Sequence, residues 1–467
     1  MKTLTIAVPS EGVPTPRVRR LSLAMCIAAG SLMACNSKDI LAVPDIDVAT
    51  PASVNDKASL PTVFAGAIGD LEVAYSTNSD NMISMEGLFT DELLWAETFP
   101  TRQEVDSRNI QVSNTSMDPI FRQVHRARAS AKRSATGYAA LDPLNPSRAE
   151  ALALEAFTYI LIGEAYCNGV PFSDVDASGT FHNGPALTTT QIYQGAITRL
   201  DSAIAVATAI GAGATTQLQL AQVLKGRTLL DQAQFAAAQT AVSGVPTSFS
   251  YVFQSSDNTS RERNGINVLV YDGRRFGVSQ LEGANGLPFR ADSLDPRVSN
   301  GRGTGAAATG FDGVTALFVE KKYPSHASNT VVADGIEARL IEAEAQYQVG
   351  NYGTAGTGTR AILNSLKSTL PAPFNAPLVD PGNNPAREDQ IFKERAYWLF
   401  LTAHRLGDMR RLIRAPYSRG SETVFPTGAF FKGGAYGTDV NWPVPFGEGN
   451  NSVAYPDGNP VCIDRNP

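Results

Sequence analysis

The sequence predicts a mainly α-helical fold, in which tetratricopeptide-like helix pairs form one compact domain with a long, irregular, loop-rich insert and a few short strands. Two segments, 215–242 and 337–366, supply the first observation, because each has the spacing of two short helices joined at a break. The second observation is the stretch between them, since 243–332 is rich in Gly, Ser, Asn and Asp. A chain of 467 residues can bury a hydrophobic core without help from metals or disulfides.

The composition excludes several classes of protein. The formal net charge is −6 and the basic residues are dispersed, so the sequence lacks the basic patch that a nucleic-acid partner requires. The four histidines and four cysteines stand in no spacing typical of zinc ligands. We therefore expect no nucleic-acid partner, no metal site and no cofactor.

Residues 1–34 are predicted to be a signal peptide. Basic residues precede an apolar run, 21–33, that is too short at ~1.5 Å per residue to cross a hydrocarbon core of ~30 Å. The run is followed by Ala34-Cys35, and this junction resembles the bacterial lipobox, in which the cysteine receives lipid and becomes the new N-terminus. We predict lipid attachment at Cys35 and a mature chain of 35–467 that is tethered to a membrane by its acyl chains. In the alternative, an ordinary signal peptide is removed and Cys35 is incidental.

Two further cysteines remain for pairing. Cys26 leaves with the signal peptide, so Cys167 and Cys462 are the thiols of the mature chain that carry no lipid. Two thiols in an oxidising compartment usually pair, and both lie next to turn-rich loops. We predict a disulfide that holds the C-terminal tail against the body; two buried, unpaired thiols are the alternative.

Helices are predicted over most of a helical body, about 55–242 and 333–415. Segment 147–165 mixes large apolar residues with Ala and Gly at helical spacing, which is typical of a helix packed on more than one side. The next helix is expected to begin after Thr188, whose hydroxyl can cap the N-terminus.

The two helix pairs that follow are predicted to be related. Their breaks fall at Asp231-Gln232 and at Gly350-Asn351, and one fixed shift of the sequence places Leu224 on Ile341. Such hairpins resemble the tetratricopeptide pattern, and each must stack on a neighbour to bury its apolar face.

The insert, about 243–332, is the expected location of a binding surface. Long irregular loops inside a compact domain usually carry function, and this one holds too many aromatic residues for a disordered linker, which is the alternative. Short strands are expected at 268–271 and 317–320. An irregular tail, about 416–467, completes the domain.

The late segment 388–414, expected to be one helix, carries a family resemblance. It contains an ER pair, then HR, then D-x-R-R, and Trp442 follows in an N-W-P-V-P segment. This arrangement resembles the SusD/RagB family of outer-membrane nutrient-binding lipoproteins. The residues that carry it are Glu394, Arg395, His404, Arg405, Asp408, Arg411 and Trp442.

These residues are predicted to have structural roles. His404 and Asp408 lie four residues apart, so that they can pair on one helix face, but no further ligands for a metal or acid–base site lie nearby in the sequence. We favour a charge network that locks the last helix to its neighbours. Trp442 is interpreted as a core aromatic clamped by prolines, with a sugar platform as the alternative.

The resemblance implies a surface-exposed lipoprotein of the outer membrane, which binds a glycan or a peptide and hands it to a SusC-type TonB-dependent transporter. Family sites tend to draw on the segment after the first long helix and on the insert. Aromatic faces suit sugar rings, and polar groups beside them suit the hydroxyls. The ligand-site candidates are therefore Trp95, Phe99 and Arg102 in the first segment and Tyr271, Asp272, Arg274 and Phe276 in the insert.

Two rival functions come from other classes of protein. A secreted glycoside hydrolase needs a pair of carboxylates, but the chain lacks the strands on which such enzymes usually mount them, and we assign no catalytic residue. A periplasmic tetratricopeptide scaffold for partner proteins is the third possibility. Release of reducing sugar separates the first rival from a binding protein, and protease accessibility on intact cells separates the second.

Overall fold

The computed structural model describes residues 56–176, 180–353, 356–460 and Cys462. The predicted signal peptide 1–34 and the predicted lipid-bearing Cys35 lie outside these residues.

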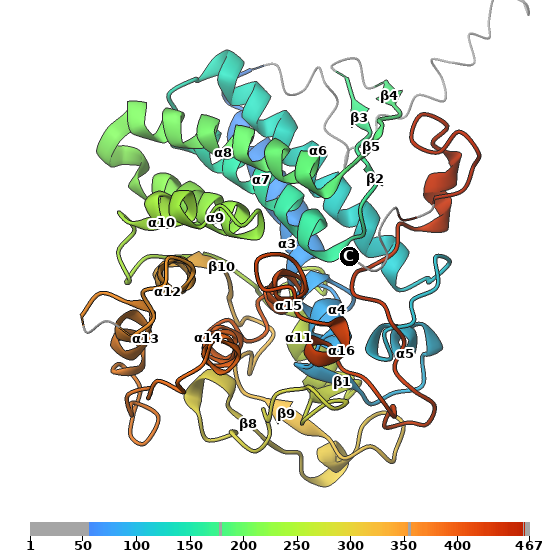
Figure 1. The fold of residues 1–467 in the computed structure, drawn as a ribbon. Helices are drawn as coiled ribbons and strands as arrows, with labels where there is room; N and C mark the ends of the chain where they lie inside the picture. The colour runs from blue at the N-terminus through green and yellow to red at the C-terminus, as the bar shows by residue number, and fades with distance from the viewer. Residues whose placement is uncertain (1–55, 177–179, 354–355, 461, 463–467) are drawn as a thin grey trace, which may run out of the picture. The chain divides into compact units, whose positions relative to one another are not determined.

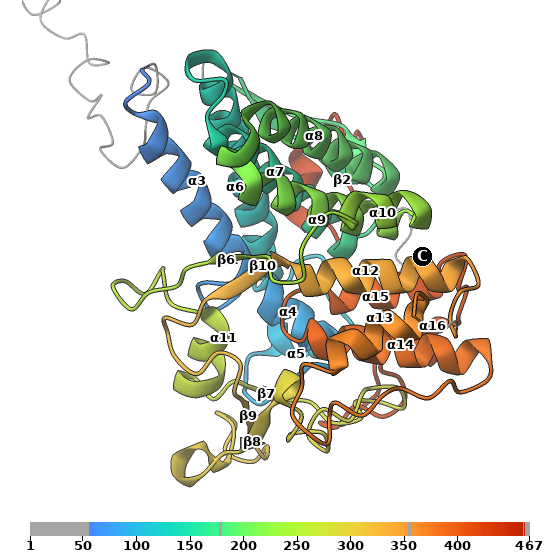
Figure 2. The same cartoon turned by 90° about the vertical axis from the view of Figure 1, so that its left-hand side faces the viewer.

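Six helices build the first part of the helical body, and α7 lies among α3, α6, α8 and α9 (Figures 1 and 2). They are α3 (Leu60–Tyr75), α6 (Met117–Leu141), α7 (Pro146–Ala165), α8 (Thr189–Ile210), α9 (Thr215–Asp231) and α10 (Phe235–Val242). Every residue of α7 from Ala153 to Ala165 is buried. Small residues allow this close packing: a Cβ at Gly163 would lie 2.5 Å from the ring of Tyr193 on α8.

The predicted cap of α8 is confirmed. The hydroxyl of Thr188 accepts a hydrogen bond from the backbone N–H of Gln191, and the Gln191 side chain accepts one from the Thr188 N–H. This reciprocal pair satisfies two amide groups that the helix leaves free.

The two predicted helix pairs are also confirmed. The first is α9–α10, and the second is α12 (Gly335–Gln348) with α13 (Thr359–Lys367). The pairs stack directly, because α10 and α12 are in contact. Gly226 on α9 lies at the crossing, where a Cβ would be 2.4 Å from Val242 and 3.3 Å from Ile341.

The insert does not separate the pairs, because its two ends are joined. Strand β6 (Ser250–Phe253) pairs antiparallel with β10 (Thr330–Asp334). The chain therefore leaves the helical body after α10 and returns beside its own exit, which brings α12 back onto α10 (Figure 2).

The insert is built from short elements. Strand β7 (Phe276–Val278) pairs with β1 (Leu93–Trp95), and β8 (Asn300–Arg302) pairs with β9 (Phe318–Glu320). The strand predicted at 317–320 is thus confirmed as β9, but the one predicted at 268–271 is wrong. That segment continues α11 (Gly265–Asn267) as a π-helical turn, Val268–Asp272, because the Asn264 side chain caps the backbone N–H of Asn267 and starts a helix.

The single helix expected over 388–414 is broken. Helix α14 (Asn384–Trp398) ends and α15 (Arg405–Ile413) begins after six residues without helical structure. Side chains from distant segments occupy the carbonyl groups that a continuous helix would use: Tyr323 donates to Leu401 O at 2.8 Å, and Tyr75 donates to Thr402 O at 2.9 Å.

Shorter elements complete the described chain. They are α4 (Met82–Phe89), α5 (Pro100–Asp106), β2 (Val170–Pro171), β3 (Asp174–Val175), β4 (Phe181–His182), β5 (Ala186–Leu187), α16 (Ser421–Val424) and the 3-10 turns at Gly211–Ala214, Pro296–Val298, Gly305–Ala308 and Phe446–Asn450.

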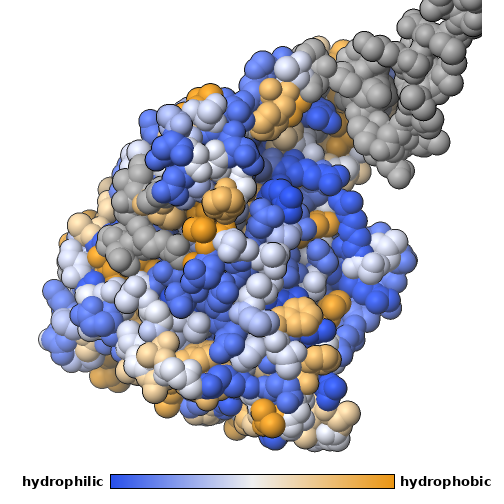
Figure 3. Space-filling model, turned by 90° about the vertical axis from the view of Figure 1, so that its right-hand side faces the viewer, coloured by the Kyte–Doolittle hydropathy of each residue, from blue (hydrophilic) through white to orange (hydrophobic). Residues whose placement is uncertain are grey.

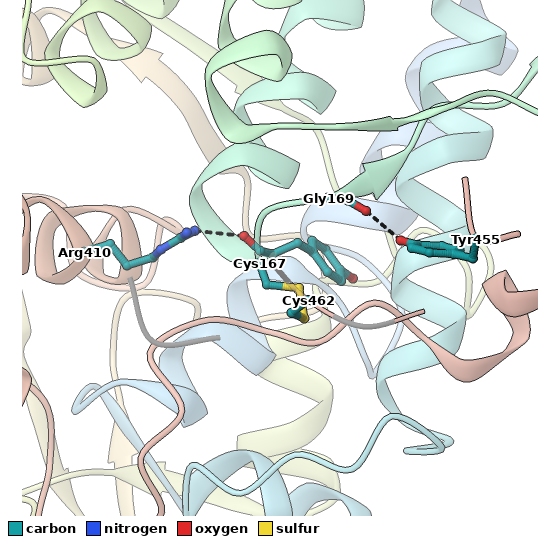
Figure 4. Close-up of a disulfide and its surroundings, with 6 residues drawn as sticks. Cys167, Gly169, Arg410, Tyr455 and Cys462 are labelled. Atoms are coloured by element: carbon teal, nitrogen blue, oxygen red, sulfur yellow. Dashed lines mark hydrogen bonds between the residues drawn. A yellow bond between two sulfur atoms is a disulfide. The ribbon is translucent and has the colours of Figure 1, made fainter. Parts of the chain in front are cut away.

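The tail is held by a disulfide between Cys167 and Cys462, whose Cα atoms are 5.6 Å apart (Figure 4). Cys167 follows the end of α7 and is fully buried. On either side of the disulfide, the Tyr455 hydroxyl donates to Gly169 O at 2.6 Å, and Arg410 on α15 donates to Tyr166 O at 3.1 Å. The tail is therefore attached next to the end of α7 by the disulfide, by the Tyr455 hydrogen bond and by two backbone hydrogen bonds, from Trp442 N to Ala165 O at 2.7 Å and from Cys167 N to Trp442 O at 2.9 Å.

One segment of the described chain, Thr189–Asp231, is long and apolar enough by composition to span a membrane. It is not one continuous helix, because α8 and α9 are separated by the turn at Gly211 and pack against each other and against α7. On the face shown in Figure 3, hydrophobic residues stand in small groups among hydrophilic ones.

Candidate functional site

The residues predicted to form a structural network are buried and joined by ion pairs. Asp408 accepts two hydrogen bonds of 2.8 Å from Arg395 and one of 2.8 Å from Arg411. Burial alone would raise the pKa of Asp408, but the two guanidinium groups outweigh it and hold that pKa well below its ordinary value. Arg411 also binds Glu344 on α12, so α14, α15 and the second helix pair are joined through charges.

Other members of the network reach different elements. Arg405 binds Asp91 through two hydrogen bonds of 2.7 and 2.9 Å, and Glu394 accepts one from Arg297 at 2.6 Å. The sequence allowed the side chains of His404 and Asp408 to pair. In the structure the His404 ring lies instead 3.2 Å from the carboxylate of Glu337. The reason is that His404 precedes the first turn of α15.

Trp442 has no exposed surface and packs edge-on against Tyr166, with ring centroids 5.5 Å apart. A sugar platform needs an exposed ring face. The sugar-platform alternative for Trp442 is therefore excluded by its burial.

The two segments predicted to hold the ligand site meet each other. Trp95 on β1 and Phe276 on β7 are register partners in the two-stranded sheet. Both are buried, however, with Trp95 7% and Phe276 0% exposed, so Phe276 cannot offer a face to a ligand and supports the sheet from the core. Figures 1 and 2 place these strands away from α8.

The other predicted ligand residues have different surroundings. Arg102 is 4% exposed and is bound by Asp80 and Glu97, so it holds α5 in place. Tyr271 donates to Glu320 O, while the Asp272 carboxylate lies 2.7 Å from the His326 ring. Arg274 donates to a backbone carbonyl, that of Ala306.

The exposed aromatic surface is formed by Phe99 and by a residue that we did not predict, Phe311. The two residues are 45% and 47% exposed, and their rings lie on the Arg275 guanidinium, with its central carbon 4.8 Å and 4.5 Å from the two ring centroids. Glu97 fixes Arg275 from the side by an ion pair of 2.5 Å. Nothing local in the sequence shows that Phe99 and Phe311 pack on the same guanidinium, because the two residues lie more than two hundred positions apart.

A cavity of about 810 Å³ adjoins this surface. The loop that carries Phe311 continues into Val314, Thr315 and Ala316, which line the cavity. Its other walls come from β1, from the loop after β7 and from the tail: Leu94, Ser279–Ala284, Arg290, Thr427–Ala429, Phe431, Lys432 and Tyr436. Phe431 is 46% exposed and adds a third aromatic face.

Charged groups also line the cavity. Glu282 accepts hydrogen bonds from Ser279 at 2.5 Å and Tyr436 at 2.9 Å, and burial raises the pKa of Glu282 to about 7. Lys432 is bound by Asp312 and lies 5.2 Å from the Trp95 ring centroid. Burial lowers the pKa of Arg290 to about 10, and the nearby Glu282 carboxyl only partly offsets this effect.

The described residues contain no group of three His, Cys, Asp or Glu side chains that could hold a metal ion. The arrangement at the cavity is instead suited to noncovalent binding, because it offers aromatic faces beside hydrogen-bond donors and acceptors.

No family model matches the sequence, and no curated protein matches it. Solved structures do match. A laminarin-binding SusD-like protein aligns with a TM-score of 0.61 at 16% identity, over 86% of this chain and 98% of its own. This chain has the SusD-like fold.

Two further SusD-like matches cover the chain to a similar extent. A SusD-like protein from Bacteroides fragilis aligns with a TM-score of 0.62 at 15% identity, over 87% of this chain and 98% of its own. Surface glycan-binding protein A from Bacteroides thetaiotaomicron aligns with a TM-score of 0.64 at 13% identity, over 85% and 98%. The predicted mainly α-helical SusD-like fold is confirmed. At these identities the likeness concerns the fold, and side chains at the site are this chain's own.

Proposed function

We propose that residues 35–467 are a surface lipoprotein of the outer membrane that binds a nutrient glycan, leaves it chemically unchanged and passes it to a SusC-type TonB-dependent transporter. The observation that carries the proposal is the pair of half-exposed rings, Phe99 and Phe311, that flank Arg275 beside the cavity. Lipid on Cys35 would hold the protein at the membrane.

Chemistry and fold both support a glycan. Exposed rings offer flat apolar faces to the C–H edges of sugars, and the neighbouring guanidinium and hydroxyl groups can bind sugar hydroxyls. Two proteins with the same fold are named for laminarin binding and for surface glycan binding.

The test is a glycan-binding screen by calorimetry with the wild type, followed by Phe99→Ala and Phe311→Ala. Each variant should weaken binding about fivefold or more, because each removes one stacking face worth roughly 1 kcal/mol or more. Phe181→Ala is the matched control, since Phe181 on β4 is 63% exposed and belongs to another part of the surface. Unchanged affinity in both site variants, with intact folding, would disprove the assignment of this site.

The rival functions are tested in the same samples. A glycoside hydrolase would release reducing sugar from a glycan that it binds, whereas the proposed protein returns the glycan intact. A peptide-binding member would respond to a peptide library and not to glycans. For the transporter, detergent extraction of membranes and affinity capture of this chain should recover a large outer-membrane barrel protein.

A further inference from the structure

One buried carboxylate, that of Glu97, holds two arginines at the exposed aromatic surface. Its Oε1 atom accepts a hydrogen bond from Arg102 at 2.6 Å, and its Oε2 atom accepts one from Arg275 at 2.5 Å. The Glu97 side chain has no exposed surface. Both of its oxygens are therefore occupied by guanidinium groups from distant segments, and Glu97 does not itself reach a ligand.

The same two arginines support the exposed rings. The Phe99 ring centroid lies 5.2 Å from the guanidinium carbon of Arg102 and 4.8 Å from that of Arg275. The Phe311 ring centroid lies 4.5 Å from the guanidinium carbon of Arg275. Both aromatic residues of the proposed glycan site thus rest on a guanidinium that Glu97 orients.

The backbone of this surface is fixed without the Glu97 side chain. Glu97 follows β1 and Arg275 precedes β7, and these strands pair through their backbones. Phe99 is the N-cap residue of α5, and Phe311 N donates to Arg274 O at 2.8 Å. Loss of the carboxylate should therefore change how the guanidinium groups and rings are oriented and leave the path of the chain intact.

The charges that touch the two rings cancel. Arg102 also binds Asp80 through two hydrogen bonds of 2.9 and 2.6 Å, so the carboxylates of Asp80 and Glu97 match the two guanidinium groups. Arg274, the sequence neighbour of Arg275, is directed away to Ala306 O.

The charged groups in the wall of the adjoining cavity are also matched. Lys432 is paired with Asp312. Glu282 and Asp106 share a proton, so this pair keeps one negative charge, which offsets that of Arg290. An anionic ligand would lose its hydration here without gaining an unmatched cation in return.

We infer that Glu97 determines which glycans the site accepts: it orients Arg275 against the two rings and neutralises its charge, so that an uncharged glycan is preferred to an anionic one. The inference rests on the proposed glycan-binding function, and it names the class of glycan and a residue that selects it. Glu97 is a positioning residue, because it acts through Arg275.

The experiment measures binding by calorimetry with uncharged oligosaccharides of laminarin, amylose and xylan, together with any uncharged glycan that binds in the wider screen. Each is used as a carboxymethyl and as a hydroxyethyl derivative with the same degree of substitution, because the two groups are similar in size and differ in charge. The wild type should bind the hydroxyethyl derivative of at least one glycan about threefold or more tightly than the carboxymethyl derivative.

Glu97→Gln should move the two affinities in opposite directions. An amide cannot accept from both arginines, so affinity for the hydroxyethyl derivative should fall about threefold. The same change leaves the charge of Arg275 unmatched, so affinity for the carboxymethyl derivative should rise about threefold and become sensitive to salt. A merely structural defect would weaken binding of both derivatives.

Two further variants separate charge from position. Glu97→Asp keeps the charge on a shorter side chain, so it should weaken both affinities and keep the preference for the uncharged derivative. Glu155→Gln is the matched control, because Glu155 is also buried and binds Arg199, whose guanidinium carbon lies 4.3 Å from the Tyr159 ring centroid in the helical body. It should change neither affinity.

Should Glu97→Gln not fold, Arg275→Gln tests the same balance from the other side. It leaves one negative charge in excess and should therefore widen the preference for the uncharged derivative.

The outcomes are separable. Binding of no glycan would overturn the proposed function. Binding of anionic glycans only, or equal or tighter binding of the carboxymethyl derivatives by the wild type, would overturn this inference alone. An unchanged preference in folded Glu97→Gln, or in folded Arg275→Gln, would also overturn it.

Discussion

The carboxylate of Asp408 on α15 receives both arms of the Arg395 guanidinium on α14, at 2.8 Å each, although the six residues between the helices are not helical. Both side chains are 2% exposed. The pair fixes the relative position of two helices that backbone hydrogen bonds no longer connect.

Asp408→Asn is expected to destabilise the protein by about 3–5 kcal/mol, because it leaves Arg395 and Arg411 buried without their shared carboxylate. Chemical denaturation measures the change in the free energy of unfolding. The matched control is Asp380→Asn, since Asp380 also binds an arginine, Arg387, through two hydrogen bonds, but at a partly exposed position. The control should change stability far less. Equal losses in the two variants would show that burial is not what makes the Asp408 pair important.

Glu86 on α4 is expected to make stability fall as pH rises. Burial raises the pKa of Glu86 to about 7, although the Leu406 N–H, which donates to it at 2.9 Å, opposes this. An acid whose pKa is raised in the folded state binds more protons there than in the unfolded chain, so its contribution is full below about pH 4.5 and is lost as pH passes 7.

Glu86→Gln keeps the acceptor for Leu406 and removes the titration. The variant should match the wild type near pH 5 and exceed it by about 2 kcal/mol at pH 8. Thermal unfolding at the two pH values gives the comparison, with Glu422→Gln at an exposed position as control. A variant that gains nothing at pH 8 would contradict the assignment of the pH effect to Glu86.

Local features were enough to predict the helix pairs. The cap at Thr188 and the breaks near Asp231 and Gly350 depend on residues adjacent in sequence, and these are where the elements begin and end. The same reasoning failed where distant side chains decide the backbone: Tyr323 and Tyr75 bind carbonyl groups that a helix over 388–414 would have used.

The candidate site was only partly predictable for the same reason. Segments around Trp95 and Phe276 were expected to carry it, and they meet as paired strands. Which rings remain exposed depends on how the insert folds back, so Phe276 lies in the core while Phe99 and Phe311 both pack on Arg275. No periodicity in the sequence encodes that contact.

Cys35→Ser is expected to release the protein from the membrane fraction, because the acyl chains are the proposed anchor and each buried CH₂ contributes ~0.8 kcal/mol. Fractionation of cells that express the variant, followed by immunoblotting, measures the redistribution. Cys26→Ser is the matched control, since Cys26 lies within the predicted signal peptide and should leave anchoring intact. A Cys35→Ser protein that stays with the membrane would remove the lipid anchor from the proposal.

Replacing both Cys167 and Cys462 by serine is expected to loosen the end of the tail around residue 462 without unfolding the helical body. The disulfide joins residues separated by 295 positions, and its loss should cost about 2–4 kcal/mol of stability. The hydrogen bond from Tyr455 to Gly169 then remains, together with the backbone hydrogen bonds from Trp442 N to Ala165 O at 2.7 Å and from Cys167 N to Trp442 O at 2.9 Å. Limited proteolysis should therefore cut the double variant within the tail sooner than the wild type, with the core fragment unchanged by mass spectrometry.

Tyr455→Phe in the wild-type background is the control. It removes the hydrogen bond and keeps the disulfide, so it should leave the tail protected. If the double variant were cut no faster than the wild type, packing of the buried Trp442 segment would be sufficient to hold the tail.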